Sequence, residues 1–219
     1  MGRVRAYLGL GANIGSPAVG SGAKAADPAE TMAAAVHDLA ALPGARLVGV
    51  SRLYATAPVG VTDQPEFRNA VVALDVPGGA DPIVEGLALL VALKGLEHSL
   101  GRRDGPRWGP RALDLDLLVF GRHAIHAERP SDARSAHPDR AAAQWLTVPH
   151  ESARDRLFVL APLADLAPGL RPPGWGETVA TARRRAELRE GPMAARPIGE
   201  WAAAAGKWTG LSKPQQRTG

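Results

Sequence analysis

The sequence predicts an α+β fold, a ferredoxin-like α/β sandwich in which helices pack on an antiparallel sheet of about four or more strands. The first observation behind this prediction is the order of the expected elements between Val4 and Phe120, which is strand, helix, strand, strand, helix, strand. The second is the composition. The chain has 219 residues, of which 45% are apolar and 22% charged, and this suits one globular domain with a substantial core.

The amino-terminal segment is expected to form a strand and then a helix. The run 4–10 is apolar with β-favouring residues and leads into a glycine-rich turn at 9–15. Asp27 can cap a helix, Pro28 suits its first turn, and a Pro-Gly pair ends it. The sequence therefore predicts a helix from about Pro28 to Leu42.

The central segment is expected to supply the remaining strands and a second helix. Alternation of apolar and polar residues predicts the strands, and Asp81 before Pro82 is typical of a helix start. The expected elements are, in order, a strand over 46–54, a long polar loop over 55–66, a strand over 67–76, a helix from Pro82 to about Leu100, and a strand over 113–120.

The carboxyl-terminal part contains few residues that predict a packed core. Residues 129–145 are rich in Arg, Ala, Ser, Asp and Pro, and we expect them to be a surface insertion. We expect one catalytic domain over 1–180, followed over 181–219 by an Arg/Ala/Pro-rich tail that packs poorly from about Arg183.

The composition excludes several kinds of chemistry. The chain has no cysteine, so disulfides, thiol nucleophiles and thiolate zinc sites are excluded, and any metal must bind to carboxylates or imidazoles. No stretch approaches the roughly 18 consecutive apolar residues of a membrane span, and the first residues lack the features of a secretory signal. We therefore expect a cytoplasmic protein, and a monomer without nucleic-acid or membrane partners.

The net charge of +4 comes mainly from arginine. Because a guanidinium can bind phosphate oxygens through two hydrogen bonds, one interpretation is a polyphosphate ligand, and another is nucleic acid. A third is that arginine is simply the common surface cation of this chain.

Two carboxylates stand two residues apart in the last expected strand. On a strand Asp114 and Asp116 point to the same face. The other face, which enters the core, receives Leu113, Leu115 and Leu117. Like charges held side by side repel unless a cation lies between them, and Mg²⁺ with the phosphates of a nucleotide is the natural partner. The alternative is a pair of solvated carboxylates on an edge strand.

The loop before this strand is rich in arginine and contains Arg102, Arg103, Arg107 and Arg111. Carboxylates for a metal ion and guanidiniums for phosphate are the groups that phosphoryl transfer requires, because catalysis there is mainly positioning and charge neutralisation. The sequence has no Walker-type glycine loop, and the glycines of 9–15 lack the dinucleotide spacing. We expect these glycines to let the backbone pass close to the site.

Ten consecutive residues, from Arg107 to Asp116, carry a more specific signal. They read Arg-Trp-Gly-Pro-Arg-Ala-Leu-Asp-Leu-Asp and resemble the signature of the 6-hydroxymethyl-7,8-dihydropterin pyrophosphokinase family. Other segments on both sides of this signature also match the family, in the family's order, and the resemblance covers roughly residues 4–175. The matching segments are 8–13, 54–60, 63–70, Glu97, 146–150 and 156–163. The resemblance implies an ATP-dependent diphosphokinase that transfers pyrophosphate from ATP to the hydroxymethyl group of the pterin and releases AMP, on the route to folate.

The resemblance also implies which residues bind which group. Asp114 and Asp116 would hold two Mg²⁺ ions that bridge the phosphates of the co-substrate ATP. The residues implied in catalysis are Arg102, Arg103, Arg111, Asp114 and Asp116; those at ATP are Glu97, Arg111, Thr147, His150 and Arg156; those at the pterin are Thr56, Val59, Phe67, Asn69, Trp108 and Phe158. The two Phe rings would stack on the flat heterocycle, and the Asn69 amide would bind its edge. Which of Arg102 and Arg103 contacts phosphate stays open.

Several of these residues also have a purely structural interpretation. His150 follows a proline and can be a turn residue, Arg156 can be an exposed charge, and both Phe side chains can be core packing. The loops 55–66 and 101–112 are long for a compact domain, and we expect them to close over the site when substrates bind.

Two other functions compete with the enzyme. An α+β sandwich with a basic surface can bind RNA, but such sheets present paired exposed aromatic residues, which the expected strands do not supply. A catalytically silent relative is the second alternative, and the intact carboxylate pair and arginine set argue against it.

Overall fold

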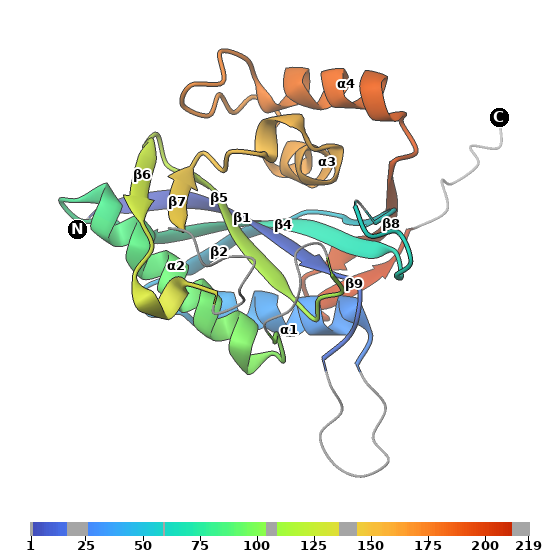
Figure 1. Ribbon diagram of the computed structural model, residues 1–219, viewed down its shortest axis with the longest axis horizontal. Helices are drawn as coiled ribbons and strands as arrows, with labels where there is room; N and C mark the ends of the chain where they lie inside the picture. Colours follow the sequence, from blue (N-terminus) through green and yellow to red (C-terminus); the bar gives the residue numbers. More distant parts are fainter. Residues whose placement is uncertain (1, 17–25, 59, 104–108, 136–143, 212–219) are drawn as a thin grey trace, which may run out of the picture.

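The computed structural model describes residues 2–16, 26–58, 60–103, 109–135 and 144–211. In this part of the chain seven strands form one antiparallel sheet, and two further strands form a separate hairpin. Two helices pack on one face of the large sheet, and on the other face one helix packs on the sheet and a second helix packs on the outside of the first (Figure 1). No helix of these residues is long and apolar enough to cross a membrane. The expected α+β fold is confirmed.

The large sheet is built around two long strands, β1 (Arg3–Ala12) and β4 (Phe67–Pro77), which pair along their whole length. The order across the sheet is β5-β1-β4-β3-β8-β9, with β2 also paired to β4. The bounds of these other strands are β2 (Arg46–Val50), β3 (Leu53–Thr56), β5 (Asp114–Phe120), β8 (Ala195–Ala202) and β9 (Lys207–Gly210).

One face of the sheet is covered by α1 (Pro28–Ala41) and α2 (Pro82–Ser99). Each helix begins after an aspartate whose side chain accepts a hydrogen bond from a backbone N–H of the first turn, at 2.8 Å for both Asp27 and Asp81. These caps explain why both helices begin where the sequence predicts. Buried leucines of both helices then pack on the inward side chains of β1, β4 and β5.

The opposite face is covered by α3 (Leu157–Leu166) and α4 (Val179–Glu190). α3 lies directly on the sheet with Leu157 and Leu160 almost fully buried, and α4 packs outside it (Figure 1). Helices therefore pack against both faces of the sheet.

A small hairpin of β6 (Ile125–Glu128) and β7 (Trp145–Val148) follows β5. Its inward residues Ile125, Leu146 and Val148 join the core beneath α1 and α2. A short 3₁₀ turn, η1 (Ser131–Ala133), lies in the connection between these two strands, and another, η3 (Ala153–Asp155), follows β7. Of the expected insertion at 129–145, residues 136–143 lie outside the described residues.

Two local expectations differ from the structure. The strand expected over 46–54 is two strands, because the Ser51 hydroxyl accepts the Val71 N–H at 2.8 Å and so interrupts the regular backbone pairing with β4. The glycine-rich turn expected at 9–15 begins later, since β1 continues through Gly9 and Gly11 to Ala12.

The expectation of a poorly packed tail from Arg183 is wrong for the described part of that segment. Residues from Arg183 onward continue α4 to Glu190. After this helix β8 pairs with β3 on one side and with β9 on the other, so the large sheet gains two strands. Small residues explain the error: Val179, Ala182 and Ala186 are fully buried although the helix around them is mostly charged. The end of the chain, 212–219, lies outside the described residues.

Candidate active site

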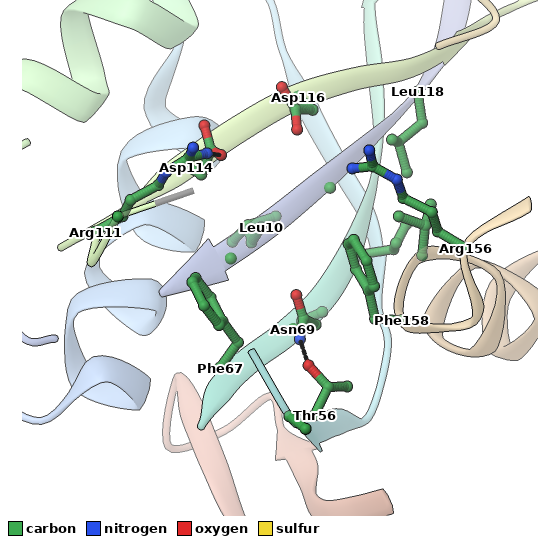
Figure 2. Close-up of a pocket in the computed structure, with 17 residues that line it drawn as sticks. Leu10, Thr56, Phe67, Asn69, Arg111, Asp114, Asp116, Leu118, Arg156 and Phe158 are labelled. Carbon is green, nitrogen blue, oxygen red and sulfur yellow. Dashed lines mark hydrogen bonds and ion pairs between the residues drawn. The ribbon is translucent and has the colours of Figure 1, made fainter. Parts of the chain in front are cut away.

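A cavity of about 120 Å³ opens between the large sheet and α3 (Figure 2). Strands β1, β3, β4 and β5 and the start of α3 contribute to its wall. The lining residues include Gly9, Gly11, Thr56, Phe67, Asn69, Arg111, Asp114, Asp116, Leu118, Arg156 and Phe158. Residues from five distant parts of the sequence therefore meet in one place, and most of them are residues that the sequence singled out.

The glycines of β1 form part of the cavity wall. A Cβ atom at Gly9 would lie 3.3 Å from Leu118 Cδ2, and one at Gly11 would lie 3.5 Å from Asn69 Oδ1. The absence of side chains on this stretch of β1 thus leaves room above the strand, as expected from the glycine-rich sequence.

Asp114 and Asp116 both line the cavity from β5. The leucines that alternate with them, Leu113, Leu115 and Leu117, are at most 2% exposed in the core beneath α1 and α2, which confirms the predicted alternation. The two carboxylates therefore lie on the same side of the strand, facing the cavity (Figure 2).

The Asp114 carboxylate is paired with two guanidinium groups. Arg102 binds its Oδ1 and Arg111 its Oδ2, and the Asp114 side chain is only 20% exposed. Burial favours the neutral acid, but the charges of Arg102, Lys94 and Arg111 outweigh it and hold the pKa of Asp114 below its usual range. Asp114 is thus a carboxylate at any physiological pH.

A buried ion cluster behind β5 holds this strand against α2. Glu97 Oε1 accepts the Leu115 N–H at 2.6 Å, binds Lys94 Nζ at 2.7 Å and lies 3.0 Å from Arg102 Nη1. Burial raises the pKa of Glu97 to about 7, against the opposing charge of Lys94. Glu97 therefore anchors the backbone between the two aspartates and also touches the arginine that pairs with Asp114.

Sequence reasoning missed Lys94. Its signal was the spacing to Glu97, since residues three apart on a helix lie on the same face and opposite charges there pair.

The other end of the cavity has apolar walls and an amide. Asn69 Nδ2 donates to Thr56 Oγ1 at 2.8 Å, and both residues are 6% exposed. Phe67 and Phe158 lie on either side of Asn69 (Figure 2). The Arg156 guanidinium lies over the Phe158 ring, 5.6 Å from its centroid. Both Phe side chains are only partly buried, so neither is plain core packing.

A second cavity, of about 590 Å³, lies between α2 and the start of the insertion. Arg102 lines it and also pairs with Asp114 of the first cavity, so this arginine lies between the two cavities. Most of its other charged lining groups are cations; the charged residues are Lys94, Glu97, Arg102, Arg103, Arg129, Asp132 and Arg134.

Two of the predicted site residues lie outside both cavities. Thr147 sits on β7 with its Oγ1 3.2 Å from His126 Nδ1. His150 follows β7; its N–H donates to the Leu118 carbonyl at 2.9 Å, and its Nδ1 accepts from the Ser152 N–H at 3.3 Å. Val59, Arg107 and Trp108 lie outside the described residues, as does the centre of the 101–112 loop.

The donor set suits a cation that shares ligands with phosphate. Among the described residues, no group of three or more His, Asp or Glu side chains gathers to bind a metal ion. Mg²⁺ typically binds one or two protein carboxylates and completes its octahedron with water and substrate phosphates. The pair Asp114 and Asp116 fits this requirement, because both are carboxylates on one strand face beside arginines that attract phosphate.

A profile of the 7,8-dihydro-6-hydroxymethylpterin-pyrophosphokinase (HPPK) family matches residues 7–168. The chain belongs to this family. The resemblance seen in the sequence is therefore confirmed, and the matched range covers every residue predicted for the HPPK site.

Two curated relatives carry the name 2-amino-4-hydroxy-6-hydroxymethyldihydropteridine pyrophosphokinase. The protein of Pseudomonas aeruginosa is 41% identical over 169 residues, which are 77% of this chain and 84% of the relative. The protein of Methylorubrum extorquens is 40% identical over 169 residues, 76% of this chain and 84% of the relative.

Solved HPPK-DHPS chains share the fold. One in complex with substrates matches with a TM-score of 0.68 at 12% identity over 95% of this chain, and wild-type Plasmodium falciparum HPPK-DHPS with pteroate matches with a TM-score of 0.65 at 15% identity over 96% of it. This chain spans about half the length of those two chains, 49% and 48%.

Proposed function

We propose that this HPPK-family chain transfers pyrophosphate from ATP to the hydroxymethyl group of 6-hydroxymethyl-7,8-dihydropterin and releases AMP, in folate biosynthesis. One observation supports this most strongly. A single cavity joins a carboxylate pair with arginines at one end to two Phe rings and a buried amide at the other. A phosphate donor and a flat heterocyclic acceptor would lie next to each other in such a cavity.

Asp114 and Asp116 would hold two Mg²⁺ ions together with phosphate oxygens of ATP. When bound, the ions neutralise phosphate charge and polarise the bond to the transferred group. Asp116 points into the cavity, and Asp114 is kept ionised by its arginines. The chain's own contribution is to hold both carboxylates on one rigid strand, fixed from behind by Glu97.

The arginines around Asp114 would bind the phosphates. Arg102 and Arg111 contact the two oxygens of one carboxylate, so they are already positioned where phosphate oxygens would arrive. Arg156 lines the same cavity from the start of α3. Guanidiniums fixed in this way stabilise the charge that develops on the transferred group without reorganising. Arg102 and Arg103 both line the second cavity, but Arg102 also pairs with Asp114 of the first cavity, which favours Arg102 as the residue at the transferred phosphates.

The nucleoside would extend from the phosphates toward the second cavity. Arg102 contributes to both regions, and Glu97 lines the second cavity, in line with its expected place near the nucleoside. Thr147 and His150 lie on and just after β7, and the His150 N–H binds β5 at Leu118. Their contact with ATP stays a prediction.

The pterin would bind between Phe67 and Phe158. Its ring has two apolar faces and an edge of donors and acceptors, which suits two aromatic rings with an amide between them. The bond from Asn69 Nδ2 to Thr56 Oγ1 fixes which way the amide points. Backbone contacts at Thr56 and Val59, closure by Trp108, and action as a cytoplasmic monomer also stay predictions.

The test is an AMP-release assay with ATP, Mg²⁺ and the pterin, comparing the wild-type chain with Asp116→Ala. We expect pterin-dependent AMP release that the substitution lowers by a factor on the order of 10³, as for the loss of one preorganised charge-stabilising group. The matched control is Asp38→Ala on α1, which packs on the opposite face of the sheet and should keep full activity. Release of ADP instead of AMP would contradict the proposed reaction.

A further inference from the structure

Helix α3 carries two side chains of different character on one stripe. Phe158 stands at its start and lines the cavity, and Asp165 stands seven residues later near its end. Seven residues make almost two full turns, so both side chains face the sheet, about 10 Å apart along the helix axis. Asp165 itself does not line the cavity and therefore does not touch a ligand there.

The Asp165 carboxylate accepts hydrogen bonds from Arg52, just before β3, and from Tyr54 in β3. Arg52 donates from Nη2 to Oδ1 at 2.6 Å, from Nε to Oδ2 at 3.1 Å, and from its backbone N to Oδ2 at 3.2 Å. The Tyr54 hydroxyl lies 2.9 Å and 3.0 Å from the two oxygens. We call these three residues, Arg52, Tyr54 and Asp165, the Asp165 cluster.

Two members of the Asp165 cluster, Tyr54 and Asp165, are shielded from solvent, and the Arg52 side chain is 38% exposed. The Tyr54 residue is 1% exposed and the Asp165 side chain 12%. Burial and the neighbouring Asp165 raise the pKa of Tyr54, so its hydroxyl keeps its proton and donates. Charge-assisted hydrogen bonds of this kind are directional, and the two-pronged contact of the arginine fixes the carboxylate in one orientation.

The same strand carries the amide end of the proposed pterin site. Tyr54 is the direct cross-strand partner of Asn69, and Thr56 lies two residues further along the same face of β3. Asn69 in turn donates to Thr56. The Asp165 cluster therefore connects α3, which carries Phe158, to the strand next to Asn69.

Apolar packing alone would leave the angle of α3 less strictly defined. Leu157, Leu160 and Leu163 are at most 1% exposed and supply the driving force for docking, but hydrophobic attraction has no preferred direction. A tilt of only about 5° around Asp165 would move Phe158 by about 1 Å over the length of two helical turns. Displacements of this size are large for an aromatic ring that must stack on a ligand.

We propose that Asp165, bound by Arg52 and Tyr54, is a positioning residue of the pterin site, because it fixes α3 so that Phe158 stands opposite Phe67 at stacking distance from a flat ligand. This inference rests on the proposed binding of the pterin between the two Phe rings. It assigns to three residues outside the cavity a role in substrate affinity.

The test is calorimetric binding of 6-hydroxymethyl-7,8-dihydropterin in the presence of Mg²⁺ and a non-hydrolysable ATP analogue. Asp165→Asn keeps the shape of the side chain and removes its charge. We expect it to raise the Kd for the pterin about tenfold, since misplacing a positioning group by about 1 Å can lower activity by as much as 10²-fold. Tyr54→Phe removes one donor and keeps the buried ring, so it should shift the Kd in the same direction by about threefold.

Asp75→Asn is the matched control. Asp75 is also a buried carboxylate, with a side chain 9% exposed that binds Arg5 at 2.5 Å and Arg46 at 2.7 Å, but it lies at the other end of β4 from Asn69. Both variants lose a comparable ion pair. We expect the pterin Kd of Asp75→Asn to stay within about twofold of wild type, as for sites that do not couple.

A double-mutant cycle separates positioning from general loss of stability. If Asp165 acts through Phe158, Asp165→Asn should change the pterin Kd less than about twofold in a Phe158→Ala background. Equal effects in both backgrounds, or equal effects of Asp165→Asn and Asp75→Asn, would overturn the proposal. Normal pterin binding by Phe158→Ala would also overturn the proposal, because Phe158 would then not be part of the pterin site. Pterin-dependent AMP release by the wild type would in that case still support the proposed reaction.

Discussion

The glycine at residue 11 of β1 gives a sharp test of where the pterin binds. Gly11→Ala would place a Cβ atom 3.5 Å from Asn69 Oδ1, which is ordinary van der Waals contact. Gly11→Val would add two methyl groups to this Cβ atom, each about 1.5 Å from it, the length of one carbon–carbon bond. Side chains of a strand stand perpendicular to the sheet, so these methyl groups would enter the space beside Asn69.

We expect the two substitutions to affect binding and folding differently. Gly11→Ala should weaken pterin binding only a few fold, whereas Gly11→Val should weaken it about 100-fold, because the ring would be displaced by about 1 Å or more. Valine is favoured in strands, so the unfolding free energy should stay within about 1 kcal/mol of wild type. A strong loss of affinity without a loss of stability is the signature of a filled binding site.

The assay is calorimetric titration of the pterin with Mg²⁺ and an ATP analogue, together with urea unfolding of each variant. Gly210→Val on β9 is the matched control, because a Cβ atom there would meet nothing within 4 Å. Gly210→Val should change neither the pterin affinity nor the unfolding free energy. Wild-type affinity in Gly11→Val would refute the placement of the pterin above β1, and unfolding of that variant would refute the inferred space above the strand.

Three further predictions concern stability. Hydrogen bonds from Arg5 and Arg46 lower the pKa of Asp75 from 3.8 to about 2. The contribution of Asp75 to the unfolding free energy is therefore present above pH 3.8 and is lost as the pH falls toward 2. Acid unfolding of Asp75→Asn should lack this loss of stability between pH 3.8 and 2. Burial raises the pKa of Glu97 from 4.5 to about 7. The contribution of Glu97 to the unfolding free energy is therefore full below pH 4.5 and is lost as the pH rises through 7. In urea unfolding, the unfolding free energies at pH 5 and pH 8 should differ less for Glu97→Gln than for wild type. Trp208→Ala should lower the unfolding free energy by about 3 kcal/mol, because a large ring is lost, and thermal unfolding would measure it.

The first half of the fold could be predicted because its signals are local. Asp27 and Asp81 cap the two helices of one layer, and alternation around Asp114 gives both the strand and the direction of its side chains. The division of residues 46–54 into two strands could not be predicted in the same way. It depends on one contact of the Ser51 hydroxyl with a residue 20 positions away.

The packed segment from α4 to β9 was missed because the residues that α4 buries are small. Ala182 and Ala186 are fully buried in a helix whose other residues are mostly charged, so the composition resembles that of an unpacked tail. Trp201 and Trp208 were a usable signal, since their rings meet at 4.7 Å edge to face and the Trp208 indole donates to the Ser51 carbonyl at 2.9 Å.

For the candidate site, the sequence predicted the lining residues better than the residues behind them. Asp114, Asp116, Asn69 and the two Phe residues meet in one cavity, and they came from motifs. Lys94, Arg52 and Asp165 came from no motif, because their importance depends on partners that are brought together only when α2, α3 and β3 pack.

The two carboxyl-terminal strands have a consequence for where this chain can be shortened. The family match ends at residue 168, but β8 lies against β3, whose residues Leu53, Tyr54 and Ala55 are at most 4% exposed. Removing β8 would turn β3 into an open edge with unpaired backbone groups and apolar side chains, which is a template for aggregation between molecules. A chain trimmed to the family boundary would therefore be expected to self-associate, even though it would keep every proposed catalytic group.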